Sequence, residues 1–263
     1  MENREKQLQS FGRLLDIMDT LREKCPWDHK QTFESLRPQT IEEVYELSDA
    51  LLNNDMKNIS KELGDVLLHV VFYAKLGSES GTFDIGDVID RLCEKLIYRH
   101  PHIYGDTVAE DAGQVIKNWE QLKQAEKDGN KTILSGVPAS LPPLIKAYRI
   151  QDKARAVGFD WQKKEDVWDK VKEEIAEFQE ESASKNFSEQ SAEAELVDVL
   201  FSIVNASRLY GLNPDNALEA TCKKFKDRFT YLEVESKKDG KKLNEMTLAE
   251  MDAYWDEAKK KGL

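Results

Sequence analysis

The acidic stretch Glu42-Glu43-Val44-Tyr45-Glu46, followed by Glu62-Leu63-Gly64-Asp65, occurs a second time as Glu173-Glu174-Ile175-Ala176-Glu177 and Glu195-Leu196-Val197-Asp198. Residues three or four apart on a helix share one face, so each motif can present its carboxylates together. Two such helices packed side by side would bring four acids to one point. Like charges about 4 Å apart repel by about 4 kcal/mol at the effective dielectric of a protein surface. Each cluster therefore needs a compensating cation, and Mg²⁺ is the natural candidate.

The duplication extends well beyond the acids. The segment from Glu62 to Leu76 aligns with the segment from Glu195 to Leu209. Further matched pairs are Cys93 and Cys222, Lys95 and Lys224, Arg99 and Arg228, Trp119 and Trp255, and Lys123 and Lys259. A repeat of about 130 residues is too long for a solenoid unit and indicates a duplicated domain.

Local signals predict helix along nearly the whole chain. Apolar residues recur at helical spacing from Leu14 to Leu21, and Cys25-Pro26 ends that helix. Thr40, with Glu43 three residues later, predicts a capping box at the start of the next helix. Further helices are predicted from about Ile59 to Leu76, from Asp84 to about Arg99, and from Asn213-Pro214 to beyond Phe229.

Turn formers and prolines concentrate between the two copies, in Asp128-Gly129-Asn130 and in the segment 135–143. We therefore expect an amino-terminal domain at residues 1–128, a linker at 129–143 and a carboxyl-terminal domain at 144–263. No stretch alternates apolar and polar residues for long enough to form a sheet. The predicted fold is all-α, with two tandem, repeated four-helix-like domains joined by a linker that contains Pro and Gly.

Composition limits the classes of partner. The 263 residues, 40% of them hydrophobic, suffice for two compact cores. A net charge of -12 argues against binding of a nucleic acid polymer or of an anionic membrane, which clustered Lys and Arg would hold. The three cysteines are too few and too dispersed for a disulfide framework or a zinc site. The polar start of the chain and the lack of an apolar run of about 18 residues indicate a cytoplasmic protein.

With these motifs in place, the sequence resembles the MazG nucleoside triphosphate pyrophosphohydrolases, an all-α family that shares its acidic signature with dimeric dUTPases. The resemblance covers nearly the whole chain. Besides the acids it includes Cys25-Pro26-Trp27-Asp28, Arg99-His100-Pro101-His102, Gly136-Val137-Pro138 and Val157-Gly158-Phe159-Asp160-Trp161.

The resemblance implies hydrolysis of a nucleoside triphosphate between the α and β phosphates, giving a nucleoside monophosphate and pyrophosphate. It implies Mg²⁺ as cofactor, with Mn²⁺ as a substitute, and a homodimer. The carboxyl-terminal copy is the expected catalytic one, with metal ligands Glu174, Glu177, Glu195 and Asp198. Its residues expected to face the substrate are Lys170, Lys224, Arg228 and Lys259 at the phosphates and Trp255 near the nucleoside. The amino-terminal copy, expected to be structural or regulatory, keeps a second metal site at Glu43, Glu46, Glu62 and Asp65.

The two copies differ at two positions beside the acids. Lys170, four residues before Glu174, aligns with Gln39, so the first copy lacks that cation. Val197 stands where the first copy has Gly64, and this β-branched side chain is expected to crowd helix packing in the second site. Water is the expected nucleophile, because no Cys-His pairing or Ser nucleophile motif is evident.

Two other classes of protein were weighed against this interpretation. A ferritin-like di-metal oxidase also gathers Glu residues in a helical bundle, but it requires Glu-x-x-His, and no Glu in this chain has a His three residues later. A non-enzymatic helical nucleotide-binding or interaction protein would account for the amphipathic segments and the charge. It gives no reason for two copies of four convergent acids.

Overall fold

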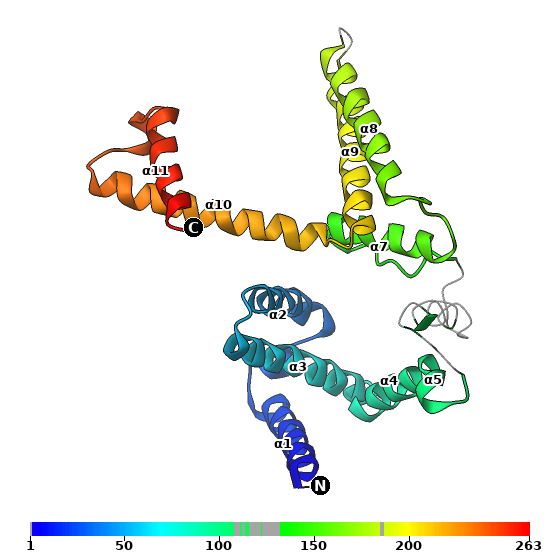
Figure 1. The fold of residues 1–263 in the computed structure, drawn as a ribbon. Helices are drawn as coiled ribbons and strands as arrows, with labels where there is room; N and C mark the ends of the chain where they lie inside the picture. Colours follow the sequence, from blue (N-terminus) through cyan, green and yellow to red (C-terminus); the bar gives the residue numbers. More distant parts are fainter. Residues whose placement is uncertain (1, 108–110, 112–113, 116–121, 123–131, 185–186) are drawn as a thin grey trace. The chain divides into compact units, whose positions relative to one another are not determined.

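The computed structural model describes residues 2–107, 111, 114–115, 122, 132–184 and 187–263, and all regular structure in these residues is helical, as predicted (Figure 1). Contacts divide the chain into two compact units, unit 1 at Met1–Leu122 and unit 2 at Lys123–Leu263. The predicted boundary after residue 128 and the first linker residues, 129–131, lie outside the described residues, as do Trp119 and Lys123. Of the helices described, none is long and apolar enough to cross a lipid bilayer.

Unit 1 consists of helices joined by short turns. Its elements are α1 (Glu2–Lys24), the 3₁₀ turn η1 (Asp28–Lys30), α2 (Phe33–Leu52), α3 (Met56–Glu79), α4 (Ile85–Arg99) and the short α5 (Pro101–Tyr104). The end of α1 before Cys25-Pro26 agrees with the prediction, and Asp84 caps α4 by accepting a hydrogen bond from the Asp87 backbone N–H. The central contact is between α2 and α3, the two helices that carry the first set of acids.

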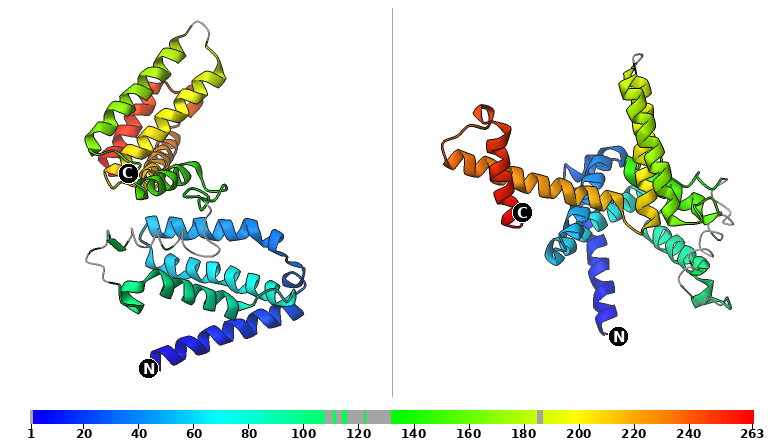
Figure 2. Two further views of the ribbon diagram at one scale, coloured as in Figure 1. Left: turned by 90° about the vertical axis from the view of Figure 1, so that its right-hand side faces the viewer. Right: turned by 45° about the horizontal axis from the view of Figure 1, so that its top comes forward.

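Unit 2 repeats the pairing of two acid-bearing helices. Its elements are α7 (Pro143–Ala156), η2 (Lys164–Asp166), α8 (Val167–Ala183), α9 (Glu189–Leu209), α10 (Pro214–Lys238), η3 (Leu243–Glu245) and α11 (Leu248–Lys260). The helix predicted at Asn213-Pro214 is α10, whose first turn is capped by the side chain of Asn213. Within this unit α8 lies beside α9, α7 packs on α9, and α11 packs against α10 (Figures 1 and 2).

The start of α2 corrects one expectation. The helix begins at Phe33 with Thr32 as its N-cap, and Thr32 and Ser35 form the capping box. Thr40 lies inside the helix, where its Oγ1 donates to the Leu36 carbonyl oxygen at 3.0 Å. The prediction placed the start too late because Thr40 and Glu43 have the spacing of a capping box, whereas the side chain of Thr32 caps the helix about two turns earlier. Pro38 lies near the start of α2, and it removes only one intrahelical hydrogen bond there.

Each unit has its own apolar core. In unit 1 the buried core consists of Met18, Leu36, Val71, Phe72 and Leu76, from three helices. In unit 2 Val167 and Val171 of α8 pack with Ala206 of α9. Burying a side chain of this size contributes roughly 1.5–3 kcal/mol, so these contacts hold the acid-bearing helices together.

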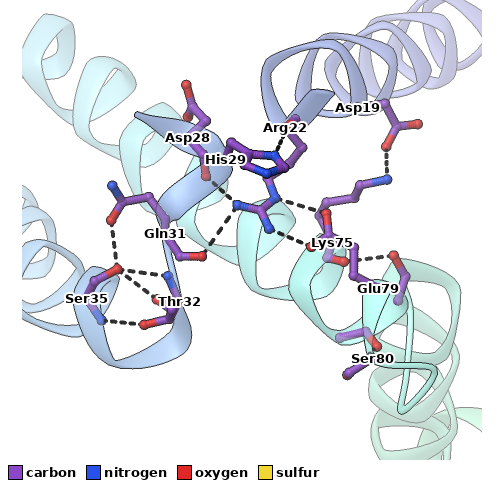
Figure 3. A network of polar contacts seen from close by, with 12 residues as sticks. Asp19, Arg22, Asp28, His29, Gln31, Thr32, Ser35, Lys75, Glu79 and Ser80 are labelled. Carbon is purple, nitrogen blue, oxygen red and sulfur yellow. Dashed lines mark hydrogen bonds and ion pairs between the residues drawn. The ribbon is translucent and has the colours of Figure 1, made fainter. Parts of the chain in front are cut away.

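A polar network centred on Arg22 fastens α1 to α3 and η1 in unit 1 (Figure 3). The guanidinium donates to both carboxylate oxygens of Glu79, at 2.9 Å and 2.5 Å, and also to the backbone carbonyl of Asp28. Lys75 of α3 pairs with Asp19 of α1 at 2.7 Å. One half-buried cation thus orients three elements around the end of α3.

Candidate metal centre and adjoining cavity

Three carboxylates of unit 2 converge between α8 and α9. Glu174 and Glu177 project from α8 and Glu195 from α9, and one oxygen from each lies within 4.8 Å of the others. Glu174 is buried, Glu195 is half-buried and Glu177 is exposed. The structure therefore brings together three of the four predicted metal ligands of this copy.

The fourth predicted ligand, Asp198, lies outside this group of three. It is exposed one turn beyond Glu195 on α9, and it lines a cavity to which Glu174 also contributes. Burial, and then the negative charge of Glu174, raise the pKa of Glu177. Both causes disfavour the ionised form of the Glu177 carboxyl.

Lys170 supplies part of the compensation in unit 2. Its Nζ lies 2.7 Å from Glu174 and 2.8 Å from Glu173, both on α8 with it. The hydrogen bond to Glu173, followed by the one to Glu174, raises the pKa of Lys170 above its ordinary range, so the amine stays charged. The predicted phosphate-facing cation thus lies directly on the carboxylate cluster.

Unit 1 contains a matching cluster of carboxylates. Glu43 of α2 and Glu62 and Asp65 of α3 each place an oxygen within 4.8 Å of the others, whereas Glu46 is exposed and lies outside the group. Burial, and then the charge of Asp65, raise the pKa of Glu43. Three of the four residues of the predicted second site therefore come together.

The two clusters take their lysines from different helices. In unit 1 Lys61 of α3 lies 2.9 Å from Glu62 and 3.5 Å from Asp65. The repeat aligns Lys61 with Ala194, and Lys170 with Gln39. The first copy lacks the Lys170 equivalent as expected, but it has a cation that the motif comparison missed, because Lys61 precedes its motif instead of preceding the Glu-Glu pair.

The expected crowding at Val197 is not present. Val197 is 54% exposed on α9, and a Cβ placed on Gly64 would meet no atom within 4 Å. This helix position faces away from the packed interface in both copies. A β-branched residue there leaves the packing of the acid-bearing helices unchanged.

A cavity of about 810 Å³ adjoins the carboxylate cluster of unit 2. Its polar wall near the cluster includes Lys170, Glu174 and Asp198. The rest of the wall is formed by residues of α7, α8, α9 and the segment that precedes α8, and most of its surface is apolar. Apolar residues of that wall are Ile150, Ala154, Phe159, Trp161, Val167 and Phe201.

Two buried polar side chains contribute to the same cavity, and each has an atom without a hydrogen-bond partner among the residues that the structure describes. Gln151 donates through Nε2 to the Phe201 carbonyl at 2.9 Å, and its Oε1 accepts no hydrogen bond. Arg208 binds Asp160 and Asn205 through its terminal nitrogens, and its Nε has no acceptor. Both atoms are buried beneath the wall of the cavity, which also includes the polar residues Asp160, Ser202 and Asn205.

The remaining predicted substrate residues gather on α10 and α11. The Arg228 guanidinium lies 5.8 Å from the centre of the Trp255 ring, which also packs on Phe225. Lys224 is exposed on α10, and Lys259 pairs with Asp256 at 2.9 Å. In the part of the chain that is described, none of these four belongs to a carboxylate cluster or to the wall of the cavity. The structure thus separates them from Lys170 and the acids within one chain.

Sequence reasoning missed Gln151 and Arg208 and quoted Asp160 only as part of a motif. A signal for Arg208 was present, because a charged residue follows the apolar run of α9 at the helical spacing of its buried face. Gln151 offered no such signal. Its burial depends on the packing of α7 against α9, which the local sequence does not reveal.

Comparisons with known proteins identify relatives of the chain. The model of the MazG nucleotide pyrophosphohydrolase domain matches residues 31–104. A Thermotoga maritima protein, "Nucleoside triphosphate pyrophosphohydrolase/pyrophosphatase MazG", is 44% identical over 252 residues, which are 95% of each chain. The Escherichia coli K12 "Nucleoside triphosphate pyrophosphohydrolase" is 38% identical over 96% of this chain and 98% of its own. An uncharacterized Bacillus subtilis protein, YabN, is 45% identical over 89% of this chain and 48% of its own.

Proposed function

Because this chain belongs to the MazG family, we propose that it hydrolyses nucleoside triphosphates between the α and β phosphates, releasing a nucleoside monophosphate and pyrophosphate. The observation that carries the proposal is the convergence of Glu174, Glu177 and Glu195 beside a cavity that Glu174 also lines and that is large enough for a small ligand. A charged cluster beside a mostly apolar wall suits a ligand with a polyanionic end and an apolar end.

The donors of the cluster fit Mg²⁺. All of them are carboxylate oxygens, the hard ligands that this ion prefers, and their mutual separation within 4.8 Å is near the span of about 4 Å set by two opposite bonds of about 2.0–2.1 Å. We propose that Glu174, Glu177 and Glu195 hold the ion, with Asp198 completing the set. When bound, Mg²⁺ neutralises phosphate charge and makes water a stronger nucleophile. Mn²⁺ has similar ligand preferences and is expected to substitute.

The side chains around the cluster contact the phosphates and exclude water in this proposal. Lys170 stays protonated, so its amine can face the phosphate oxygens as well as the carboxylates. The apolar wall excludes water from one side of the site and thereby strengthens the electrostatic contacts there. Burial, and then the charge of Glu174, raise the pKa of Glu177, and a cation bound among the three carboxylates would favour the ionised form.

We further propose that the protein is a homodimer in which α10 and α11 of one copy face the carboxylate cluster of the other. In this arrangement Lys224, Arg228 and Lys259 neutralise phosphate oxygens and Trp255 lies near the nucleoside. Large apolar side chains support it, because they are exposed on both helices that would meet. They are Leu196, Leu200 and Phe201 on α9, and Leu218, Phe225 and Phe229 on α10.

Unit 1 has a secondary role in this proposal. Glu43, Glu62 and Asp65, with Glu46 nearby, form a second metal site that is structural or regulatory. The expected location is the cytoplasm, where nucleoside triphosphates and Mg²⁺ are both present.

The test is product analysis with each common nucleoside triphosphate and Mg²⁺. We expect one monophosphate and one pyrophosphate for each triphosphate consumed, and no turnover after chelation of the metal. Release of orthophosphate in place of pyrophosphate would contradict cleavage between the α and β phosphates. Light scattering coupled to gel filtration checks the homodimer, and a monomeric mass for the active protein would refute that part.

A further inference from the structure

Glu173 is the acid of the Glu-Glu-x-x-Glu motif of unit 2 that lies outside the carboxylate cluster. It directly precedes Glu174 on α8, so the helical period turns its side chain about 100° away from that of Glu174. As far as the described residues extend, Glu173 is also absent from the wall of the cavity, and its side chain is 55% exposed. Its carboxylate accepts a hydrogen bond from Lys170 Nζ at 2.8 Å.

The Lys170 amine bridges Glu173 and the cluster. Its Nζ also lies 2.7 Å from Glu174, the buried carboxylate that belongs to the cluster and lines the cavity. An ammonium group has three N–H donors, so it can serve both carboxylates at once. The hydrogen bond to Glu173 is the largest cause of the raised pKa of Lys170, ahead of the one to Glu174. Glu173 is therefore a principal partner of the amine.

Unit 1 holds its lysine differently. Lys61 Nζ lies 2.9 Å and 3.1 Å from the two carboxylate oxygens of Glu62 and 3.5 Å from Asp65. Both of these acids belong to the cluster of that unit. Glu42 stands at the position equivalent to Glu173, but Gln39 stands where a lysine would meet it. Of the two described clusters, the one in unit 2 therefore shares its lysine with an acid outside the cluster.

This sharing has a consequence when a divalent ion is bound at the cluster of unit 2. A Glu174 carboxylate that ligates an ion attracts the Lys170 amine less, and the ion itself repels the amine. The carboxylate of Glu173 points away from the ligand set, so its negative charge stays available. Lys170 can then keep one hydrogen bond and its place at the cavity wall. Without Glu173, the amine either competes with the ion for Glu174 or moves into solvent.

We propose that Glu173 is a positioning residue, which retains the Lys170 amine beside the cavity when a divalent ion is bound at Glu174. The lysine can thus release a metal ligand without leaving the site. Glu173 acts only through Lys170 and touches neither the ion nor the substrate. This inference rests on the proposed function, because the ion and the phosphates are those of the proposed reaction.

A double-mutant cycle on the full chain tests the inference. The parent protein carries Glu43→Gln, which weakens the cluster of unit 1, so that the titration reports on unit 2. Mg²⁺ affinity is measured by calorimetry without nucleotide for the parent, for Glu173→Gln, for Lys170→Gln and for the double variant. Glu180→Gln is the matched control, because it removes the same charge from the exposed surface of α8 about two turns further along. Circular dichroism verifies that each variant is folded.

Glu173→Gln should weaken Mg²⁺ binding about three- to fivefold, because the amine then competes with the ion for Glu174. In the presence of Lys170→Gln the same substitution should change the affinity less than about twofold, and so should Glu180→Gln. Glu173→Asp keeps the charge three residues from Lys170 and should bind Mg²⁺ within about twofold of the parent. Equal effects of Glu173→Gln with and without Lys170, or no effect in either background, would overturn the proposal.

Steady-state kinetics of the same proteins give a second measurement. At saturating Mg²⁺, Glu173→Gln should raise KM for the triphosphate about two- to fivefold and change kcat less than about twofold, because the lost contact orients an amine and involves no reacting atom. In the Lys170→Gln background both constants should be insensitive to Glu173→Gln. A fall in kcat at constant KM would contradict a positioning role.

Failure of the proposed function gives a different result. A protein that binds Mg²⁺ but releases no pyrophosphate would refute the reaction, and the calorimetric cycle would still decide the role of Glu173. Pyrophosphate release together with additive effects in the cycle would overturn the inference and leave the reaction standing. Absence of Mg²⁺ binding by the parent protein at millimolar concentrations would also overturn the inference, because Lys170 would then have no ion to yield to.

Discussion

The guanidinium of Arg208 donates two hydrogen bonds to the carboxylate of Asp160, from Nη2 to Oδ1 at 2.5 Å and from Nη1 to Oδ2 at 3.1 Å. The Arg208 side chain is 3% exposed, so the charge would be costly without its partner. The pair ties the segment before α8 to the far end of α9. It therefore fixes one wall of the cavity at a distance from the metal ligands.

Asp160→Asn should destabilise the protein by about 3 kcal/mol, because it leaves the buried guanidinium without its counter-charge. Urea unfolding measures the change. Asp169→Asn, which removes the partner of Lys172 in an exposed pair, is the matched control and should cost less than about 1 kcal/mol. Equal losses of unfolding free energy in the two variants would show that the Arg208–Asp160 pair contributes no more to stability than an exposed pair.

Acid should weaken the contact between α1 and α3. The hydrogen bond from Arg22 holds the pKa of Glu79 below its ordinary value of 4.5. A carboxylate with a lowered folded-state pKa contributes stability above its unfolded pKa and loses that contribution as the pH falls through the folded value. The free energy of unfolding of Glu79→Gln should therefore lie below that of the wild type at pH 7 and approach it toward pH 3. A difference that stays constant over this range would contradict the role of the charge.

Two glycines of α3 should respond oppositely to the same substitution. A Cβ on Gly77 would lie 2.7 Å from the Phe83 ring and from its backbone oxygen, so Gly77→Ala should destabilise by about 1–3 kcal/mol. A Cβ on Gly64 meets no atom within 4 Å, so Gly64→Ala should stabilise by roughly 0.5–1 kcal/mol. Thermal unfolding measures both changes. A neutral Gly77→Ala substitution would contradict the close approach of Phe83 to α3 at this position.

Removing one ligand from each cluster should separate their roles. Glu174→Gln should lower kcat/KM by at least about 100-fold, because it removes the buried carboxylate shared by the cluster and the cavity. Glu43→Gln makes the same change in unit 1 and should leave most of the activity. Steady-state kinetics of pyrophosphate release provide the comparison. Equal loss in both variants would assign catalysis to both clusters.

Lys170 should affect metal and substrate in opposite directions. Lys170→Gln removes a cation that lies 2.7 Å from Glu174, so Mg²⁺ should bind the free protein about two- to fivefold more tightly. The KM for the triphosphate should rise, because a phosphate-facing charge is lost. Calorimetry measures the first change and kinetics the second. If both affinities fall, Lys170 instead acts by holding α8 in place.

The all-helical class, the ends of some helices and the meeting of three acids in each copy could be predicted, because each depends on local spacing. The helix predicted from about Ile59 to Leu76 extends from Met56 to Glu79. Asp84 and Asn213 are residue types that favour the N-cap position, and each caps the helix that follows it. Glu174 and Glu177 lie on one face of α8 because they are three residues apart. The cavity could not be predicted, since Gln151 and Phe201 come together only through the packing of α7 on α9. The position of Trp255 relative to the acids also depends on how helices assemble, and no local pattern reports that.

The opposite placement of Lys61 and Lys170 indicates how the duplicated halves diverged. Lys61 pairs with Glu62 and Asp65 on its own helix α3, whereas Lys170 pairs with Glu173 and Glu174 on its own helix α8, and a long aliphatic stem lets the amine reach the cluster from either helix. The position of the neutralising lysine therefore differs between the two units, while each unit keeps a cluster of three carboxylates. A sequence pattern that requires a lysine at the position of Lys170 would match unit 2 but not unit 1, where Gln39 stands at that position.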